Sequence, residues 1–168
     1  MKRSRKFSPA TLALAALVAL AGCGDTQPKA INYGRDECAE CKMTLVNQRY
    51  GAELISAKGK VFKFDDLNCL LAFEKKNAAG PAPQAYVVDC NRPNQFLSSD
   101  QAILLQHDGL RTPMGSRFAA FASETELETA RTQLGGAGKT LRWPDLLRPP
   151  SAEKTAACTT CCSAEKKP

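Results

Sequence analysis

The chain has 168 residues, of which 43% are hydrophobic, 24% are charged and eight are cysteines. This length suits one domain or two very small ones and excludes a large multidomain enzyme, and the ordinary charged fraction argues against disorder throughout. The net charge of +6 does not indicate nucleic-acid binding. Four of the 23 basic residues lie in the first six positions, and the other 19 are scattered among 17 acidic residues.

Residues 1–22 have the pattern of a lipoprotein signal peptide: a basic start, then an apolar run that is too short to span a bilayer. The run ends in Leu-Ala-Gly-Cys, which is typical of a bacterial lipobox and makes Cys23 the expected lipidation site. A plain signal peptide cut near a cysteine is the alternative. Because full processing adds more than one acyl chain, the mature protein would be durably anchored and periplasm-facing, on the inner or the outer membrane.

The mature chain divides by composition into three parts. Residues 23–34 carry few apolar residues and are expected to form a lipidated tether. Residues 149–168 begin with Pro-Pro-Ser and have no apolar periodicity, so a disordered tail that contains cysteines is expected. The folded domain is therefore predicted over residues 35–148.

The first half of this domain is predicted as strand, strand, helix, strand. Residues 49–55 and 60–64 flank a short turn and indicate a β-hairpin. Asp65 or Asp66 is then placed to cap a helix over residues 67–76, which has an apolar stripe. Residues 85–89 follow as another apolar strand.

The second half repeats pieces of the first. Residues 138–146 resemble residues 59–67, and Met114 with the segment after it echoes Met43 with the segment after it. The two offsets differ by eight residues, which fits a helix inserted at about 124–134, with Thr125 and Glu128 in a capped first turn. A duplication would give two units, about 35–92 and 93–148, in which the two methionines occupy equivalent places and meet at the interface.

Three sulfur-bearing residues stand close together in Cys38-Ala39-Glu40-Cys41-Lys42-Met43. Thiolate and thioether are soft ligands that favour Cu(I) over hard cations, whereas zinc has little use for methionine sulfur. Three other interpretations stay open: half of a structural disulfide with Met43 as a core filler, a thiol-disulfide catalyst, and a four-cysteine zinc site completed by the tail.

The remaining histidine and cysteines are weaker candidates. His107, the single histidine, lies in turn-forming company, which favours a polar turn residue over a ligand. Cys69 and Cys90 lie in a predicted helix and at the end of a predicted strand, and a structural role is favoured for both. The tail offers a possible secondary metal site at Cys158, Cys161 and Cys162, or a nonspecific soft-metal segment.

Together, these motifs resemble the NosL family of copper-binding lipoproteins, accessory proteins of nitrous oxide reductase. The resemblance covers most of residues 12–147 and is carried by the lipobox and three further segments. These are residues 37–43 (Glu-Cys-Ala-Glu-Cys-Lys-Met), 63–66 (Lys-Phe-Asp-Asp) and 114–122 (Met-Gly-Ser-Arg-Phe-Ala-Ala-Phe-Ala).

The resemblance implies an α+β protein of two small ββαβ-type units in one compact body, related to the fold of organomercurial lyase. It implies a monomeric Cu(I) chaperone that passes copper toward nitrous oxide reductase through an ABC-type maturation complex. Cys41 and Met43 match the family's Cys-x-Met ligands, Met114 matches the methionine of its second motif, and Cys38 matches a cysteine often found three places before Cys41. The family often ends in histidines, whereas this chain ends in cysteines.

No catalytic ensemble is evident in the sequence, which has one histidine, no nucleophile motif and no nucleotide-binding loop, so an enzyme is not expected. A shared fold with a lyase does not confer its activity. The alternative function is a periplasmic soft-metal lipoprotein that sequesters or detoxifies copper or mercury, because Hg(II) is also thiophilic.

Overall fold

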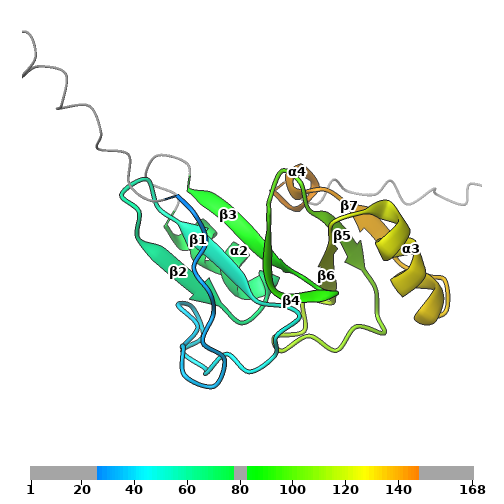
Figure 1. Cartoon of the computed structure of the whole chain (residues 1–168), viewed down its shortest axis with the longest axis horizontal. Coiled ribbons are helices and arrows are strands. Elements are labelled where there is room, and N and C mark those ends of the chain that lie inside the picture. Colours follow the sequence, from blue (N-terminus) through cyan, green and yellow to red (C-terminus); the bar gives the residue numbers. More distant parts are fainter. Residues whose placement is uncertain (1–25, 78–82, 148–168) are drawn as a thin grey trace, which may run out of the picture.

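The computed structural model describes residues 26–77 and 83–147 (Figure 1). The predicted signal peptide, Cys23 and the tail cysteines lie outside the described residues. Among the residues that are described, no helix is both long and apolar enough to cross a membrane. The elements in chain order are β1 (Ala52–Ile55), β2 (Val61–Phe64), α2 (Leu67–Lys76), β3 (Gln84–Asp89), β4 (Arg92–Ser98), β5 (Ile103–Gln106), β6 (Phe118–Phe121), α3 (Glu124–Gln133), β7 (Lys139–Leu141) and α4 (Trp143–Leu147).

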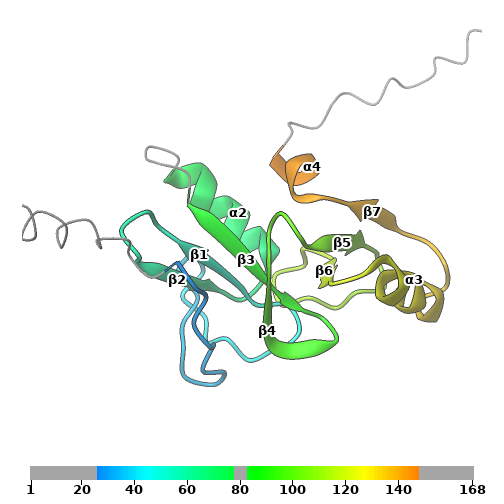
Figure 2. The ribbon, with the colours of Figure 1, turned by 45° about the horizontal axis from the view of Figure 1, so that its top comes forward.

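The strands form one mixed sheet in the order β2-β1-β3-β6-β5-β7, with β4 paired to β3. All pairs are antiparallel except β3 and β6, which meet in parallel at Asp89 and Ala120. Figures 1 and 2 show the result as two halves side by side, with α2 on the β1–β3 half and α3 on the β5–β7 half. The predicted α+β class is confirmed.

The first half has the expected strand, strand, helix, strand order. β1 and β2 pair in register from Ala52 opposite Phe64 to Ile55 opposite Val61. Gly59 closes the hairpin turn at φ 76°, a conformation that glycine adopts without steric cost. The side chain of Asp66 accepts a hydrogen bond from the Asn68 N–H and so caps α2, which runs over the predicted residues.

The second half differs from the expected repeat. β6 follows Met114 as β1 follows Met43, but β7 pairs with β5 and not with β6, so the β1–β2 hairpin has no counterpart there. The inserted helix is present, yet its cap is Ser123, which accepts from the Glu126 N–H, and not Thr125 with Glu128. β4 begins at residue 92 and pairs with β3, so it completes the first half of the sheet, although it falls almost wholly after the expected boundary.

The core has two hydrophobic clusters. The larger one includes the face of α2 and strands β1 to β3 and extends into the second half through Leu104, Ala120 and Trp143. Ile31 is 3% exposed in this cluster, and the backbone N–H of Lys29 donates to the buried carboxylate of Glu53 at 2.8 Å. Part of the segment expected to act as a tether thus packs on the first half, because the apolar side chain of Ile31 is buried in the core.

Candidate metal centre

The segment that carries Cys38 and Cys41 folds into a tight loop. An isolated antiparallel bridge joins Glu37 to Thr44, and the Cys38 N–H donates to the Met43 carbonyl at 2.8 Å. The chain reverses at Lys42, which has φ 65°. This reversal folds Met43 back beside Cys38, so the first and last residues of the Cys-x-x-Cys-x-Met motif are held together by the backbone.

The loop is attached to the first half at two places. The Ala39 N–H donates to the Lys63 carbonyl of β2 at 2.7 Å. Glu40 forms an ion pair with Lys76 at the end of α2. These contacts hold the loop against the ββα arrangement, with α2 fixed to β2 by the packing of Phe73 on Phe62 and Phe64.

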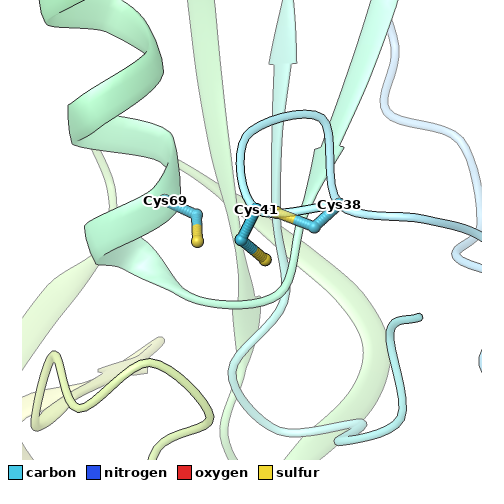
Figure 3. A group of neighbouring side chains, drawn as sticks. All are labelled: Cys38, Cys41 and Cys69. Atoms are coloured by element: carbon cyan, nitrogen blue, oxygen red, sulfur yellow. The ribbon is translucent and has the colours of Figure 1, made fainter. Parts of the chain in front are cut away.

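Three sulfur atoms meet where this loop faces α2. The Sγ atoms of Cys38, Cys41 and Cys69 all lie within 4.8 Å of one another. Figure 3 shows Cys69 projecting from the beginning of the helix toward the loop that carries the other two. Cys38 and Cys69 are buried, at 0% and 4% exposure, whereas Cys41 is partly exposed. The cluster therefore opens to solvent at Cys41.

The surroundings of the three thiols differ. Burial disfavours a thiolate at Cys38, but the backbone N–H groups of Cys41, Asp65 and Glu40 act on its sulfur and lower its pKa below the ordinary value. Burial raises the pKa of Cys41 and is opposed by the backbone N–H of Met43. Burial and the adjacent Cys38 raise the pKa of Cys69. Cys38 is thus the most readily ionised of the three, although it is the most buried.

Met114 belongs to the loop before β6, which docks on the first turn of α2. Its backbone N–H donates to Oδ2 of Asp66 at 2.9 Å, and its carbonyl accepts from Nδ2 of Asn68 at 3.2 Å. The Ser116 N–H also donates to Oδ2 of Asp66, at 3.3 Å. The second half of the molecule thereby delivers Met114 to the residues immediately before Cys69.

Both methionines of the predicted ligand set are exposed, with 57% of Met43 and 38% of Met114 accessible. Thioether sulfur is a soft ligand, so two exposed methionines, one on the loop of Cys41 and one on the loop docked on α2, are chemically suited to a soft metal ion. The structure thus joins Cys38 and Cys41 in one cluster and places Met43 on the same loop. It also brings the Met114 backbone to the helix that carries Cys69.

Cys69 is the residue whose place in this cluster the sequence reasoning missed. It was expected to have a structural role, but its sulfur faces Cys38 and Cys41. Its position in the first turn after a capping aspartate was an available signal, because helix N-termini favour anionic ligands and thiolates. That signal could not show which loop lies opposite the helix.

The other candidates lie elsewhere. Cys90 is buried in the second cluster, and its Sγ accepts from Nη2 of Arg49 at 3.2 Å. His107 forms the expected turn, with its carbonyl accepting from the Leu110 N–H and its Nδ1 accepting from the Gly109 N–H. Each of the four cysteines in the described part of the chain is a free thiol.

Comparisons with known proteins agree with this geometry. The family model described as NosL matches residues 29–148. Among solved structures, the crystal structure of the copper chaperone NosL from Shewanella denitrificans matches with a TM-score of 0.61 and 23% sequence identity, over 72% of this chain and 96% of that one. At this identity the match shows a shared fold. No curated protein matches the chain. Because the family model spans well over half of its residues, the chain belongs to the NosL family.

Proposed function

We propose that this protein is an exported, lipid-anchored Cu(I) chaperone that supplies copper for the assembly of nitrous oxide reductase. The observation that carries the proposal is the sulfur-rich surface site, where a cluster of three cysteine sulfurs meets the loop of Met43 and the backbone of Met114. Membership of the NosL family and the fold shared with a copper chaperone support the same function.

Cu(I) is bound here as cargo by Cys41 as thiolate and by Met43 and Met114 as thioethers, with Cys38 as an additional ligand. Without Cys38, the set of Cys41, Met43 and Met114 has one thiolate and two neutral sulfurs, which gives a site of low charge. Such a site releases its ion by exchanging ligands one at a time with a partner that offers more thiolates or imidazoles. The exposed position of both methionines supports this step, because an incoming partner can reach the ion from the solvent side.

The location and partners follow from the sequence and the family. The signal peptide and lipobox support anchoring through Cys23 on a membrane that faces the periplasm, and the family supports delivery through an ABC-type complex. The protein acts as a monomer and without enzymatic activity in this scheme. A strain that lacks the chain should make nitrous oxide reductase with less copper, and copper content measured by mass spectrometry on the purified reductase checks this.

The ligand assignment is tested with Met114→Ala. Loss of one thioether should lower the Cu(I) affinity while the fold remains intact, because the backbone and not the side chain of Met114 bonds to Asp66. Anaerobic competition titration against a Cu(I) chelator measures the affinity, and circular dichroism checks the fold. Unchanged stoichiometry and affinity would remove Met114 from the site. Cys41→Ala should abolish tight binding, and if it does not, the proposed site is wrong.

The alternative is a soft-metal sequestering lipoprotein, which the three-thiol cluster specifically favours because Hg(II) is strongly thiophilic. A chaperone should release Cu(I) to a thiolate-rich acceptor within the time of a stopped-flow or gel-filtration assay. A sequestering protein should retain copper in that assay and should protect cells against mercury or copper salts. Measuring release and resistance in the same strain separates the two functions.

A further inference from the structure

Two buried thiols lie beside Cys41: Cys38, which the scheme above uses only as an additional ligand, and Cys69, which it does not use. Cys38 and Cys69 are almost fully buried, yet their sulfurs lie within 4.8 Å of each other and of the Cys41 sulfur. They come from separate elements, a loop and a helix, and both lie next to Cys41 (Figure 3). The side chains of Met43 and Met114 are exposed, at 57% and 38%.

The spacing of the three thiols suits one metal ion. With metal–sulfur bonds of about 2.3 Å, three thiolates around a trigonal ion stand about 4.0 Å apart. The observed separations, all within 4.8 Å, are close to this value. The backbone N–H groups that surround the Cys38 sulfur, and the Met43 N–H at the Cys41 sulfur, are donors that remain available to a metal-bound thiolate.

We propose that the protein offers Cu(I) two overlapping sulfur sets that share Cys41: an inner set of Cys38, Cys41 and Cys69, and an outer set of Cys41, Met43 and Met114. The ion passes between the sets while its bond to Cys41 persists. Bonds to the thioethers form as bonds to Cys38 and Cys69 break, and copper stays monovalent. Each inner thiol releases one proton to water when it binds and regains one when it lets go.

The two sulfur sets differ in charge and in solvent access, and we therefore assign them different roles. The inner set offers thiolates in a buried position, so it retains the ion away from solvent and from competing ligands. The outer set has one thiolate and two neutral sulfurs at the surface, so it presents the ion to a partner. This inference rests on the proposed Cu(I) function and adds the position in which the cargo is held before transfer.

A double-mutant cycle distinguishes two alternative sets from one combined set. We use full-length protein in detergent, with Cys158, Cys161 and Cys162 replaced by serine in every sample. Cys69→Ala removes an inner ligand, Met114→Ala removes an outer ligand, and a third variant has both changes. Cys38→Ala is a second inner variant. Cys90→Ala is the matched control, because it truncates another buried cysteine that lies outside the cluster.

When either set can replace the other, each single variant should lose less than about tenfold in Cu(I) affinity, and the double variant more than about a hundredfold. X-ray absorption should show only short thiolate bonds in Met114→Ala and a larger thioether share in Cys69→Ala. Met114→Ala should also transfer copper to a thiolate acceptor more slowly. Cys90→Ala should match the parent, and thermal unfolding of each metal-free variant checks the fold.

Two results would overturn the two-set proposal and leave the copper function in place. One is a double variant whose loss equals the product of the single losses, which indicates a single set with all sulfurs bound together. The other is unchanged affinity and absorption spectra in both Cys69→Ala and Cys38→Ala. If Cys41→Ala still bound Cu(I) tightly, the copper site itself would be wrong, so the two failures are separable.

Discussion

A carboxyl group in the middle of β1 has almost no access to water. Glu53 is fully buried, its Oε2 accepts from the Lys29 N–H, and its Oε1 has no hydrogen-bond partner among the described residues. Burial raises the pKa of Glu53 to about 7, against the opposing effects of the Lys29 N–H and the Lys63 ammonium, and with a further increase from Asp36. The protonated form is therefore favoured in the folded protein.

This pKa makes stability depend on pH. In the unfolded chain Glu53 ionises near 4.5, so between about pH 4.5 and 7 the folded state holds more protons and stability falls as pH rises. We expect a loss on the order of 3 kcal/mol that is complete above the folded pKa. Glu53→Gln should abolish this loss, as measured by urea unfolding at pH 5 and pH 8. An equal pH dependence in parent and variant would contradict the assignment.

At the residue scale, the sequence indicated those candidate ligands whose side-chain types stand together in a short motif. Cys41 and Met43 were recognisable as candidate ligands because a thiol and a thioether stand two positions apart, and the family motif added Met114 and Cys38 as candidates. Cys69 was not, because its neighbours in the chain are ordinary helix residues and its partners come from a loop that precedes the hairpin. The burial of Glu53 could not be predicted either. The alternating pattern of β1 gives one polar face, and nothing in it shows that this face is also buried.

Among the elements, α2 carries the site and α3 does not. Leu70 of α2 and Leu127 of α3 are both buried, at 0% and 1% exposure; Leu70 lies in the larger hydrophobic cluster and Leu127 in the smaller one. Truncating either to alanine should cost roughly 2–5 kcal/mol, because each leaves a cavity. Only Leu70→Ala should also lower the Cu(I) affinity, since α2 positions Cys69 and the cap that receives Met114.

This pair separates damage to the site from damage to the fold. Urea unfolding gives the stability of each metal-free variant, and competition titration under native conditions gives the affinity. Leu127→Ala should keep its affinity within about twofold of the parent, as expected for distant sites. A comparable loss of affinity in both variants would mean that the copper site responds to stability in general and not to the placement of α2.

Elements with local signals were predicted well, and those fixed by distant pairing were not. α2 matches its predicted bounds because a capping aspartate precedes it and an apolar stripe runs along it. β7 has only three residues, and its partner β5 lies more than thirty positions earlier, across β6 and α3. Its pairing is set by the shape of the whole sheet, and a local repeat with β2 could not reveal it.

A buried carboxylate links the two halves of the molecule beside the site, next to the hydrogen bond from Asn68 to the Met114 carbonyl. Asp66 is fully buried. Its carboxylate accepts hydrogen bonds from the Asn68 N–H in the first half and from the N–H groups of Met114 and Ser116 in the second. The remaining sheet contact between the halves is the short parallel pairing of Asp89 with Ala120. The position of Met114 relative to the cysteines therefore depends on Asp66.

Asp66→Ala should remove the cap and leave buried donors unpaired, at a cost of about 1–3 kcal/mol in stability. It should also lower the Cu(I) affinity to that of Met114→Ala, and combining the two changes should cause no further loss. The milder Asp66→Asn keeps one acceptor oxygen, so its stability and its Cu(I) affinity should lie between those of the parent and those of Asp66→Ala. Full additivity of Asp66→Ala and Met114→Ala in the titration would show that the carboxylate does not act through Met114.

The pairing of β4 with β3 determines where the chain can be truncated without exposing a strand edge. β3 has β1 along one edge, and its other edge is covered by β4, whose residues come after the point where the chain would be divided by sequence. A fragment cut at residue 92 would carry the cysteines yet expose that edge, and uncovered strand edges recruit other chains. A fragment that carries the candidate metal site would have to extend through Ser98 to stay soluble as a single copy.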